Sequence, residues 1–124
     1  FWTINVINAK SLGSAKKIAF SIANSPLVKT AVAGEDPNWG RIAMGLGKSG
    51  EPVDVKKLKI KIGEYIVAEN GKVSDNYDEK KLKEYMEWDA IEIEVNLKLG
   101  NDAFKCYTCD FTHDSIDINA DYRN

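Results

Sequence analysis

The segment IEIEVNLKL, Ile91–Leu99, alternates apolar and polar side chains along its whole length. A period of two is typical of a β-strand with one buried face and one solvated face. We expect Gly100-Asn101-Asp102 to turn the chain into a partner strand at residues 103–111. The segment therefore predicts a sheet that packs one face against a hydrophobic core.

Patterns before this strand predict the rest of the sheet and its helical cover. Apolar, β-rich runs predict further strands at residues 1–7, 27–33, 58–62 and 65–69, and Asn70-Gly71 is a strong hairpin signal. Helical spacing and helix start signals predict helices capped by Ser11 or Ser14 and ending at 24–26, from 37 to about 47, and from 78 to 88. The class is therefore α+β, a mixed or antiparallel sheet covered by two to three helices, and we expect a single domain over residues 1–124.

The composition excludes two classes of function. The chain has 17 basic and 19 acidic residues with no basic block, so it lacks the charge pattern of a nucleic-acid-binding protein. No apolar run reaches the roughly 20 residues that a membrane-spanning helix needs, and we expect no membrane partner. Two cysteines in a Lys- and Glu-rich chain favour a reducing compartment, the cytoplasm or an organelle matrix. Because the chain begins at Phe1 rather than Met, we interpret it as a fragment or a processed product.

The segment SPLVKTAVAGEDPNWGRIAMGLGKSG, Ser25–Gly50, carries the most specific local pattern. Asp36 suits a helix N-cap and Pro37 suits the first helical position. Gly34 lets the chain turn before them, so we expect Glu35 at a strand-to-helix corner, where a carboxylate can meet a ligand. A helix start whose acids complement the helix dipole explains the same residues without a ligand. Three glycines in the following helix indicate a close neighbour, either another backbone or a ligand: Gly40, Gly45 and Gly47.

Two other patterns match known binding motifs but lack their context. The run GLGKSG, Gly45–Gly50, has the letters of the dinucleotide fingerprint, yet that motif opens a helix and this run is expected to close one. Cys106 and Cys109, followed by His113, look like half of a zinc site, but the sequence has no second Cys or His pair to complete the four ligands. On a strand these two thiols point to opposite faces, so we expect small buried or half-buried side chains. We predict no metal site and no cofactor.

The C-terminal run CDFTHDSIDINADYRN, residues 109–124, is unusual for a chain end. It keeps the β-like residues Ile116 and Ile118 and then becomes dense in hydrogen-bonding groups. An amide and a terminal carboxylate can both orient a polar substrate, although a tail docked only for stability has the same composition. His113 falls between two strand-like segments and is expected in a loop.

Both the Ser25–Gly50 segment and the C-terminal run closely resemble the glutamate N-acetyltransferase family, also called ornithine acetyltransferases, of arginine biosynthesis. The resemblance extends from about Val6 to Asn124. Members are made as one precursor that cleaves itself before a Thr, which becomes the N-terminal nucleophile of the downstream chain. The resemblance implies that this chain is the C-terminal, substrate-contacting part of such a downstream chain.

The resemblance also implies which residues contact the substrate. The Glu of the family's G-E-D motif is Glu35 here, and the Asn of its terminal I-N-A-D-Y-R motif is Asn119. A carboxylate suits substrates that are amino acids or their N-acetyl forms, because it accepts hydrogen bonds from ammonium and amide groups. The family's last residue is usually a Thr or Ser that contributes its side chain. Here that position is Asn124, so an amide replaces a hydroxyl.

The implied reaction moves an acetyl group from N2-acetylornithine to glutamate through an acetyl-Thr intermediate, and some members also use acetyl-CoA as donor. No catalytic residue is expected in this chain, because Phe1 is not Thr and Thr3 is not terminal. The chain alone is therefore expected to be inactive. Its implied partners are the small-molecule substrates and the upstream chain of the same precursor, in a heterotetramer of two of each chain.

Two alternatives remain open at the level of sequence. The first is a non-catalytic α+β interaction module whose glycine-rich helix packs on a protein partner. The second is part of a related self-processing hydrolase that shares the N-terminal Thr chemistry but releases its product to water. Glu35 and Asn119 favour the acetyltransferase over the interaction module. Only residues upstream of this chain could distinguish it from the hydrolase.

Overall fold

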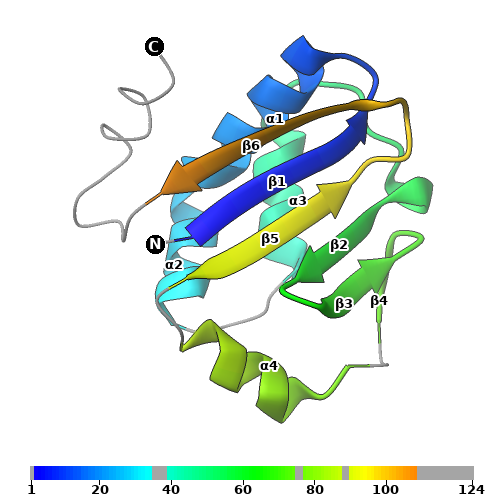
Figure 1. The fold of residues 1–124 in the computed structure, drawn as a ribbon. Helices are drawn as coiled ribbons and strands as arrows, with labels where there is room; N and C mark the ends of the chain where they lie inside the picture. Colours follow the sequence, from blue (N-terminus) through cyan, green and yellow to red (C-terminus); the bar gives the residue numbers. More distant parts are fainter. Residues whose placement is uncertain (1, 35–38, 75–76, 88–89, 109–124) are drawn as a thin grey trace.

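The described residues form a mixed six-stranded sheet that packs one face against helices (Figure 1). The computed structural model describes residues 2–34, 39–74, 77–87 and 90–108. The strands are β1 (Trp2–Ala9), β2 (Lys59–Ile62), β3 (Tyr65–Glu69), β4 (Lys72–Val73), β5 (Ile91–Asn96) and β6 (Asp102–Thr108). Their order is β4-β3-β2-β5-β1-β6, with β1 and β5 parallel and every other neighbouring pair antiparallel. The predicted α+β class with a mixed sheet is confirmed.

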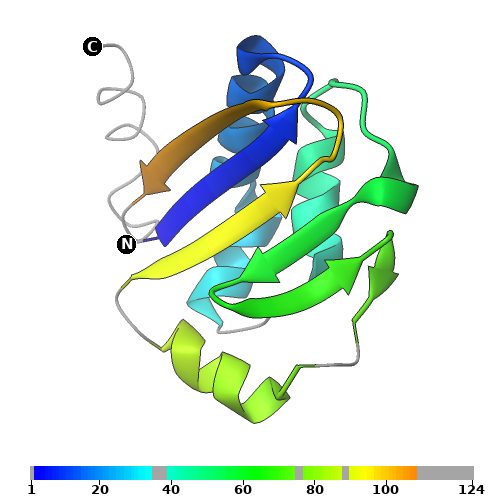
Figure 2. The same ribbon diagram turned by 45° about the vertical axis from the view of Figure 1, so that its right-hand side comes forward.

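Three of the helices cover one face of this sheet, as Figures 1 and 2 show from two directions. The helices are α1 (Leu12–Ala23), α2 (Pro26–Ala33), α3 (Trp39–Gly47) and α4 (Glu79–Met86), with a short 3-10 turn η1 (Val55–Lys57) before β2. Helix α4 lies at one end of the sheet, where the Tyr85 hydroxyl accepts a hydrogen bond from the Glu92 backbone N–H at 3.0 Å. Within the described residues, no helix has the length and apolar character to span a bilayer.

The hydrophobic core lies between the sheet and its helices, chiefly α1. The apolar side chains of β5 are buried and its polar ones are half-buried, which confirms the predicted alternation. Ser11 caps the start of helix α1 with its hydroxyl, which accepts the Ser14 N–H at 3.1 Å, and the helix buries the face that its spacing predicts. Each fully buried aliphatic side chain contributes about 1.5–3 kcal/mol to folding. The central ones are Ile4, Val6, Ile18, Ile22, Ile93 and Val95.

The strand after Gly100 does not pair with β5, contrary to the sequence-based expectation. Strand β6 pairs with β1, which lies between β5 and β6. The chain leaves β5 at Asn96 and crosses the end of β1, where the backbone N–H groups of Leu99 and Gly100 donate to the Asn8 carbonyl. A side chain at position 100 would collide with the Ala9 carbonyl, so glycine is required at this crossing. Pairing with a distant strand therefore replaces the expected local hairpin.

The predicted strand at residues 27–33 is also wrong, because this segment forms helix α2. The Ser25 carbonyl accepts the Lys29 N–H at 3.0 Å, and the Ser25 hydroxyl lies 3.4 Å from the Val28 nitrogen, as in a helix N-cap. Pro26 occupies the first helical position, where its missing N–H costs nothing. These start signals and the burial of Val28 outweigh the strand preference of the β-branched residues.

Candidate functional site

Helix α3 packs very closely against α1 and α2 at Gly45. A Cβ at this position would lie 3.3 Å from the Ser25 Cβ and 3.4 Å from the Ile22 Cα. The Ser21 hydroxyl donates a hydrogen bond to the Gly45 carbonyl, which fixes α3 against α1. The close neighbour that the helix glycines indicate is therefore, at Gly45, the backbone and side chains of α1 and the start of α2. By contrast, a Cβ at Gly47 would have no atom within 4 Å.

This packing fixes the end of α2 and the start of α3, the two helix ends on either side of Glu35 in the sequence. Helix α2 is followed by Gly34, whose N–H donates to the Thr30 carbonyl at 3.0 Å, and α3 begins at Trp39. Glu35 itself lies outside the described residues, together with the predicted cap Asp36 and Pro37. Because α2 is a helix, the link that carries Glu35 joins two helices, and the expected strand-to-helix corner is corrected accordingly.

The second predicted group of site residues follows strand β6. Its members, Asn119 and Asn124, lie beyond Thr108, outside the described residues, and so do Cys109 and His113, for which no binding role was predicted. Thr108 pairs with Trp2 at the start of β1, and Trp2 pairs with Ile91 at the start of β5. Figures 1 and 2 both show α2 at this same end of the sheet. The segments that carry the substrate-binding candidates therefore leave the described fold at one end of the sheet.

A small polar hollow of about 290 Å³ lies at this end. It is lined by the starts of β1 and β5, the end of β6 and helix α4. In it, the Lys105 ammonium lies 3.8 Å from the Glu92 carboxylate. Because side chains alternate along a strand, Thr3 and Glu92 point to the face of the sheet away from α1–α3. The sequence analysis did not single out these residues, since only the parallel register of β1 and β5 brings them together.

The structure places Cys106 in the core. Its side chain is fully buried and its thiol lies 3.7 Å from the Ala19 carbonyl. Desolvation by burial raises the pKa of the Cys106 thiol to about 12. A neutral, buried thiol is neither a metal ligand nor a redox nucleophile at physiological pH. Among the described residues, no group of three or more His, Cys, Asp or Glu side chains could hold a metal ion.

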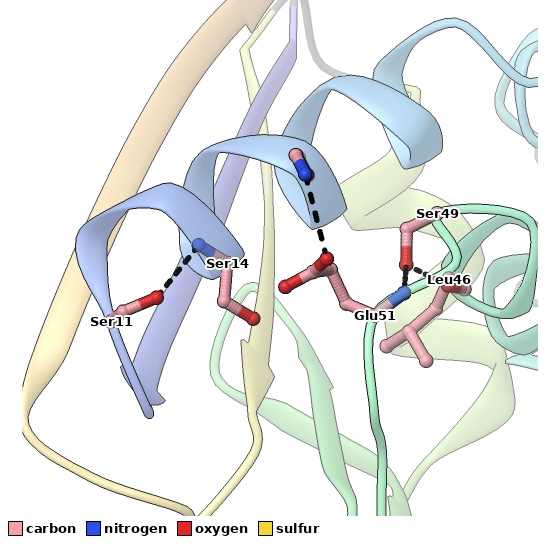
Figure 3. Close-up of polar contacts among 6 residues, drawn as sticks. Ser11, Ser14, Leu46, Ser49 and Glu51 are labelled. Atoms are coloured by element: carbon pink, nitrogen blue, oxygen red, sulfur yellow. Dashed lines mark hydrogen bonds and ion pairs between the residues drawn. The ribbon is translucent and has the colours of Figure 1, made fainter.

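The run Gly45–Gly50 closes helix α3, as its sequence context predicts. The helix ends at Gly47, and Gly50 has a φ of 76°, the left-handed conformation that glycine adopts readily. The Ser49 hydroxyl donates to the Leu46 carbonyl at 2.7 Å and accepts the Glu51 N–H at 3.2 Å (Figure 3). The Glu51 carboxylate then pairs with Lys17 of α1 at 3.8 Å. The turn thus fastens the end of α3 to α1 and does not form a nucleotide loop.

A larger groove runs along the outer side of α1. It has a volume of about 700 Å³ and extends from Gly13 to Pro26, with Lys48 and Ser49 on its other side. Helical spacing in the sequence brings Lys16, Phe20 and Asn24 onto one face of α1. The sequence could not predict that Lys48 and Ser49, just after the end of α3, also line the groove, because their position depends on the close contact at Gly45.

The fold defines an α+β protein with a mixed sheet. The two segments that carry its candidate ligand-contacting residues, after α2 and after β6, both leave the described fold at one end of this sheet. The model of the ArgJ family matches residues 1–124. This chain belongs to the ArgJ family, which confirms the resemblance drawn from its two motifs.

Curated relatives and a solved structure agree with this assignment. The arginine biosynthesis bifunctional protein ArgJ of Gluconobacter oxydans (strain 621H) is 52% identical over 121 residues, covering 98% of this chain and 28% of that protein. The protein of the same name from Ruegeria pomeroyi is 50% identical over 124 residues, covering 100% of this chain and 30% of that protein. The crystal structure of arginine biosynthesis bifunctional protein ArgJ from Bacillus halodurans has a TM-score of 0.84 at 35% identity, over 98% of this chain and 57% of that one. The chain thus spans less than a third of these curated relatives.

Replacing Gly45 by Ala should destabilise the full-length protein by about 1 kcal/mol, because the neighbouring Ile22 Cα and Ser25 Cβ belong to packed helices and cannot move aside. Gly47→Ala is the matched control in the same helix, and it should be neutral or raise stability by about 0.5 kcal/mol. The midpoint of thermal unfolding measures both effects. Equal midpoints for the two variants would contradict the close contact at Gly45.

Proposed function

We propose that this chain is the C-terminal, substrate-contacting part of an acetyltransferase that moves an acetyl group from N2-acetylornithine to glutamate. The observation that carries the proposal is the match of the ArgJ family model to all of residues 1–124. Relatives about half identical to this chain bear the name arginine biosynthesis bifunctional protein. Acetyl transfer between these two amino acids is a reaction of arginine biosynthesis in the family that the motifs resemble.

In this proposal, Glu35 and Asn119 bind the amino-acid substrate, and Asn124 contributes its side-chain amide. The Glu35 carboxylate accepts hydrogen bonds from the ammonium or amide of the substrate. The Asn119 amide can both donate and accept, which suits a zwitterionic ligand. The proposal is supported by the convergence of α2 and the end of β6 at one end of the sheet, since Glu35 follows α2 closely and the C-terminal segment that carries Asn119 and Asn124 follows β6.

The nucleophile of this reaction is a Thr outside these residues, made N-terminal by self-cleavage of a precursor. Its hydroxyl attacks the acetyl carbonyl of N2-acetylornithine, the carbonyl–nitrogen bond breaks, and ornithine leaves with the proton. The α-amine of glutamate then attacks the acetyl-Thr ester and regenerates the Thr. Residues 1–124 form a single domain that holds the substrates, paired with the upstream chain in a heterotetramer of two of each chain. Acetyl-CoA is a second donor in some members, and the enzyme acts in the cytoplasm.

The full-length protein should form N-acetylglutamate from N2-acetylornithine and glutamate. Double-reciprocal plots of its initial rate should give the parallel lines of a ping-pong mechanism. Mass spectrometry of the products distinguishes this reaction from hydrolysis. Release of acetate at the same rate with and without glutamate would favour the related hydrolase. Absence of both products from folded, self-cleaved protein would overturn the acetyltransferase proposal.

Within that enzyme, Glu35→Ala should raise the KM for N2-acetylornithine about tenfold or more, because the loss of a charge-assisted hydrogen bond costs roughly 1.5–3 kcal/mol. Glu64→Ala is the matched control, since Glu64 is exposed in the turn between β2 and β3. Steady-state kinetics and circular dichroism of both variants check the effect and the fold. An unchanged KM in Glu35→Ala would return Glu35 to the role of a helix-start residue.

A further inference from the structure

The groove along α1 is large enough for an organic ligand. Its volume of about 700 Å³ lies within the range of small-molecule sites. The half-buried Phe20 ring forms one wall and is itself held by Phe104 of β6, with the ring centroids 5.6 Å apart. Pro26, the first residue of α2, also lines the groove. The wall is thus apolar and fixed by the packing of the fold.

Positive charge is concentrated on this groove although the chain as a whole is slightly acidic. Three lysines line it, Lys16, Lys17 and Lys48, and none of its ten described lining residues is acidic. The nearby Glu51 carboxylate pairs with Lys17. No ion pair within the described residues engages Lys16 or Lys48, and both are exposed. The surface therefore carries an excess of about two positive charges, which attracts anions.

The hydrogen-bond donors of the groove also favour a negatively charged ligand. The hydroxyl protons of Ser21 and Ser49 are already donated to the carbonyls of Gly45 and Leu46. The side-chain groups of the described lining residues for which no donated hydrogen bond is found are the ammonium groups of Lys16 and Lys48, the Asn24 amide and the Ser25 hydroxyl, which accepts the Val28 N–H. A ligand that offers mainly acceptors, such as a phosphate or a carboxylate, satisfies these donors.

We propose that this groove binds a multiply charged organic anion, with its phosphate or carboxylate groups among Lys16, Lys17 and Lys48 and its apolar part against Phe20. The proposal is independent of acetyl transfer. The cationic end of the groove lies beside the last turn of α3, whereas the link that carries Glu35 precedes the first turn of that helix. Nine helical residues separate these ends by about 13 Å.

Isothermal titration calorimetry of the full-length protein tests the proposal with three probes: ATP, benzene-1,3,5-tricarboxylate and pyrophosphate. At least one aromatic probe should bind, and Lys16→Glu/Lys48→Glu should weaken it by about tenfold or more. Lys80→Glu/Lys81→Glu on the exposed face of α4 introduces the same change in charge and should leave the affinity unchanged. Phe20→Leu should weaken the aromatic probes several-fold and spare pyrophosphate. The tighter of the two aromatic probes identifies phosphate or carboxylate as the charged group.

Three results would overturn the proposal. One is the absence of binding by both aromatic probes, and another is an equal loss of affinity in the two double-lysine variants, which indicates attraction to net charge alone. The third is protection of Lys16 and Lys48 from acetylation by an N-hydroxysuccinimide ester in the full-length protein, because another part of the protein would then cover the groove. Acetyl transfer by the same preparations reports separately on the proposed function.

Discussion

The parallel pairing of β1 with β5 is the constraint on which the rest of the structure depends. It joins the first strand to one that begins about ninety residues later, in a register from Trp2–Ile91 to Ile7–Asn96. Parallel neighbours need a crossover connection, and here the intervening chain supplies the helices of the cover and the β2–β4 meander. Because β1 occupies the position beside β5, the last described strand has to cross the end of β1 and pair on its far side. The starts of β1 and β5 and the end of β6 thereby meet at one end of the sheet.

The close packing of α1, α2 and α3 determines where α2 ends and where α3 begins, on either side of the link between them. Buried small residues on α1 let it lie close to the sheet, and Gly45 lets α3 lie close to α1. Ser25 starts α2 directly after α1 ends, so the chain reverses without a long loop. The link proposed to contact the substrate thus lies between two helices that pack on the rest of the fold, and sites carried by packed helices are held more precisely than sites on loops.

Elements with strong local signals could be predicted from the sequence. The alternation in β5, the buried face and Ser11 cap of α1, and the Asn70-Gly71 hairpin are determined by neighbouring residues, and the structure confirms them. The partner of β6 was not predictable in this way, and the helical state of residues 26–33 only in part, through the local start signals Ser25 and Pro26. They depend on burial against α3 and on a strand a hundred residues away, and tertiary contacts of this kind outweigh local preference.

The candidate site likewise has one part that the sequence predicted and another that only tertiary packing reveals. Glu35, Asn119 and Asn124 were found through motifs, whereas the polar hollow and the α1 groove arise from packing between distant segments and have no local signal. The central claim is that the Glu35 link and the C-terminal segment contact one substrate. A crystal structure of the full-length protein with N2-acetylornithine tests it most directly. The account predicts side-chain atoms of Glu35 and Asn119 within about 3.2 Å of the same ligand molecule. A ligand held by neither side chain, or by residues of a different surface, would contradict it.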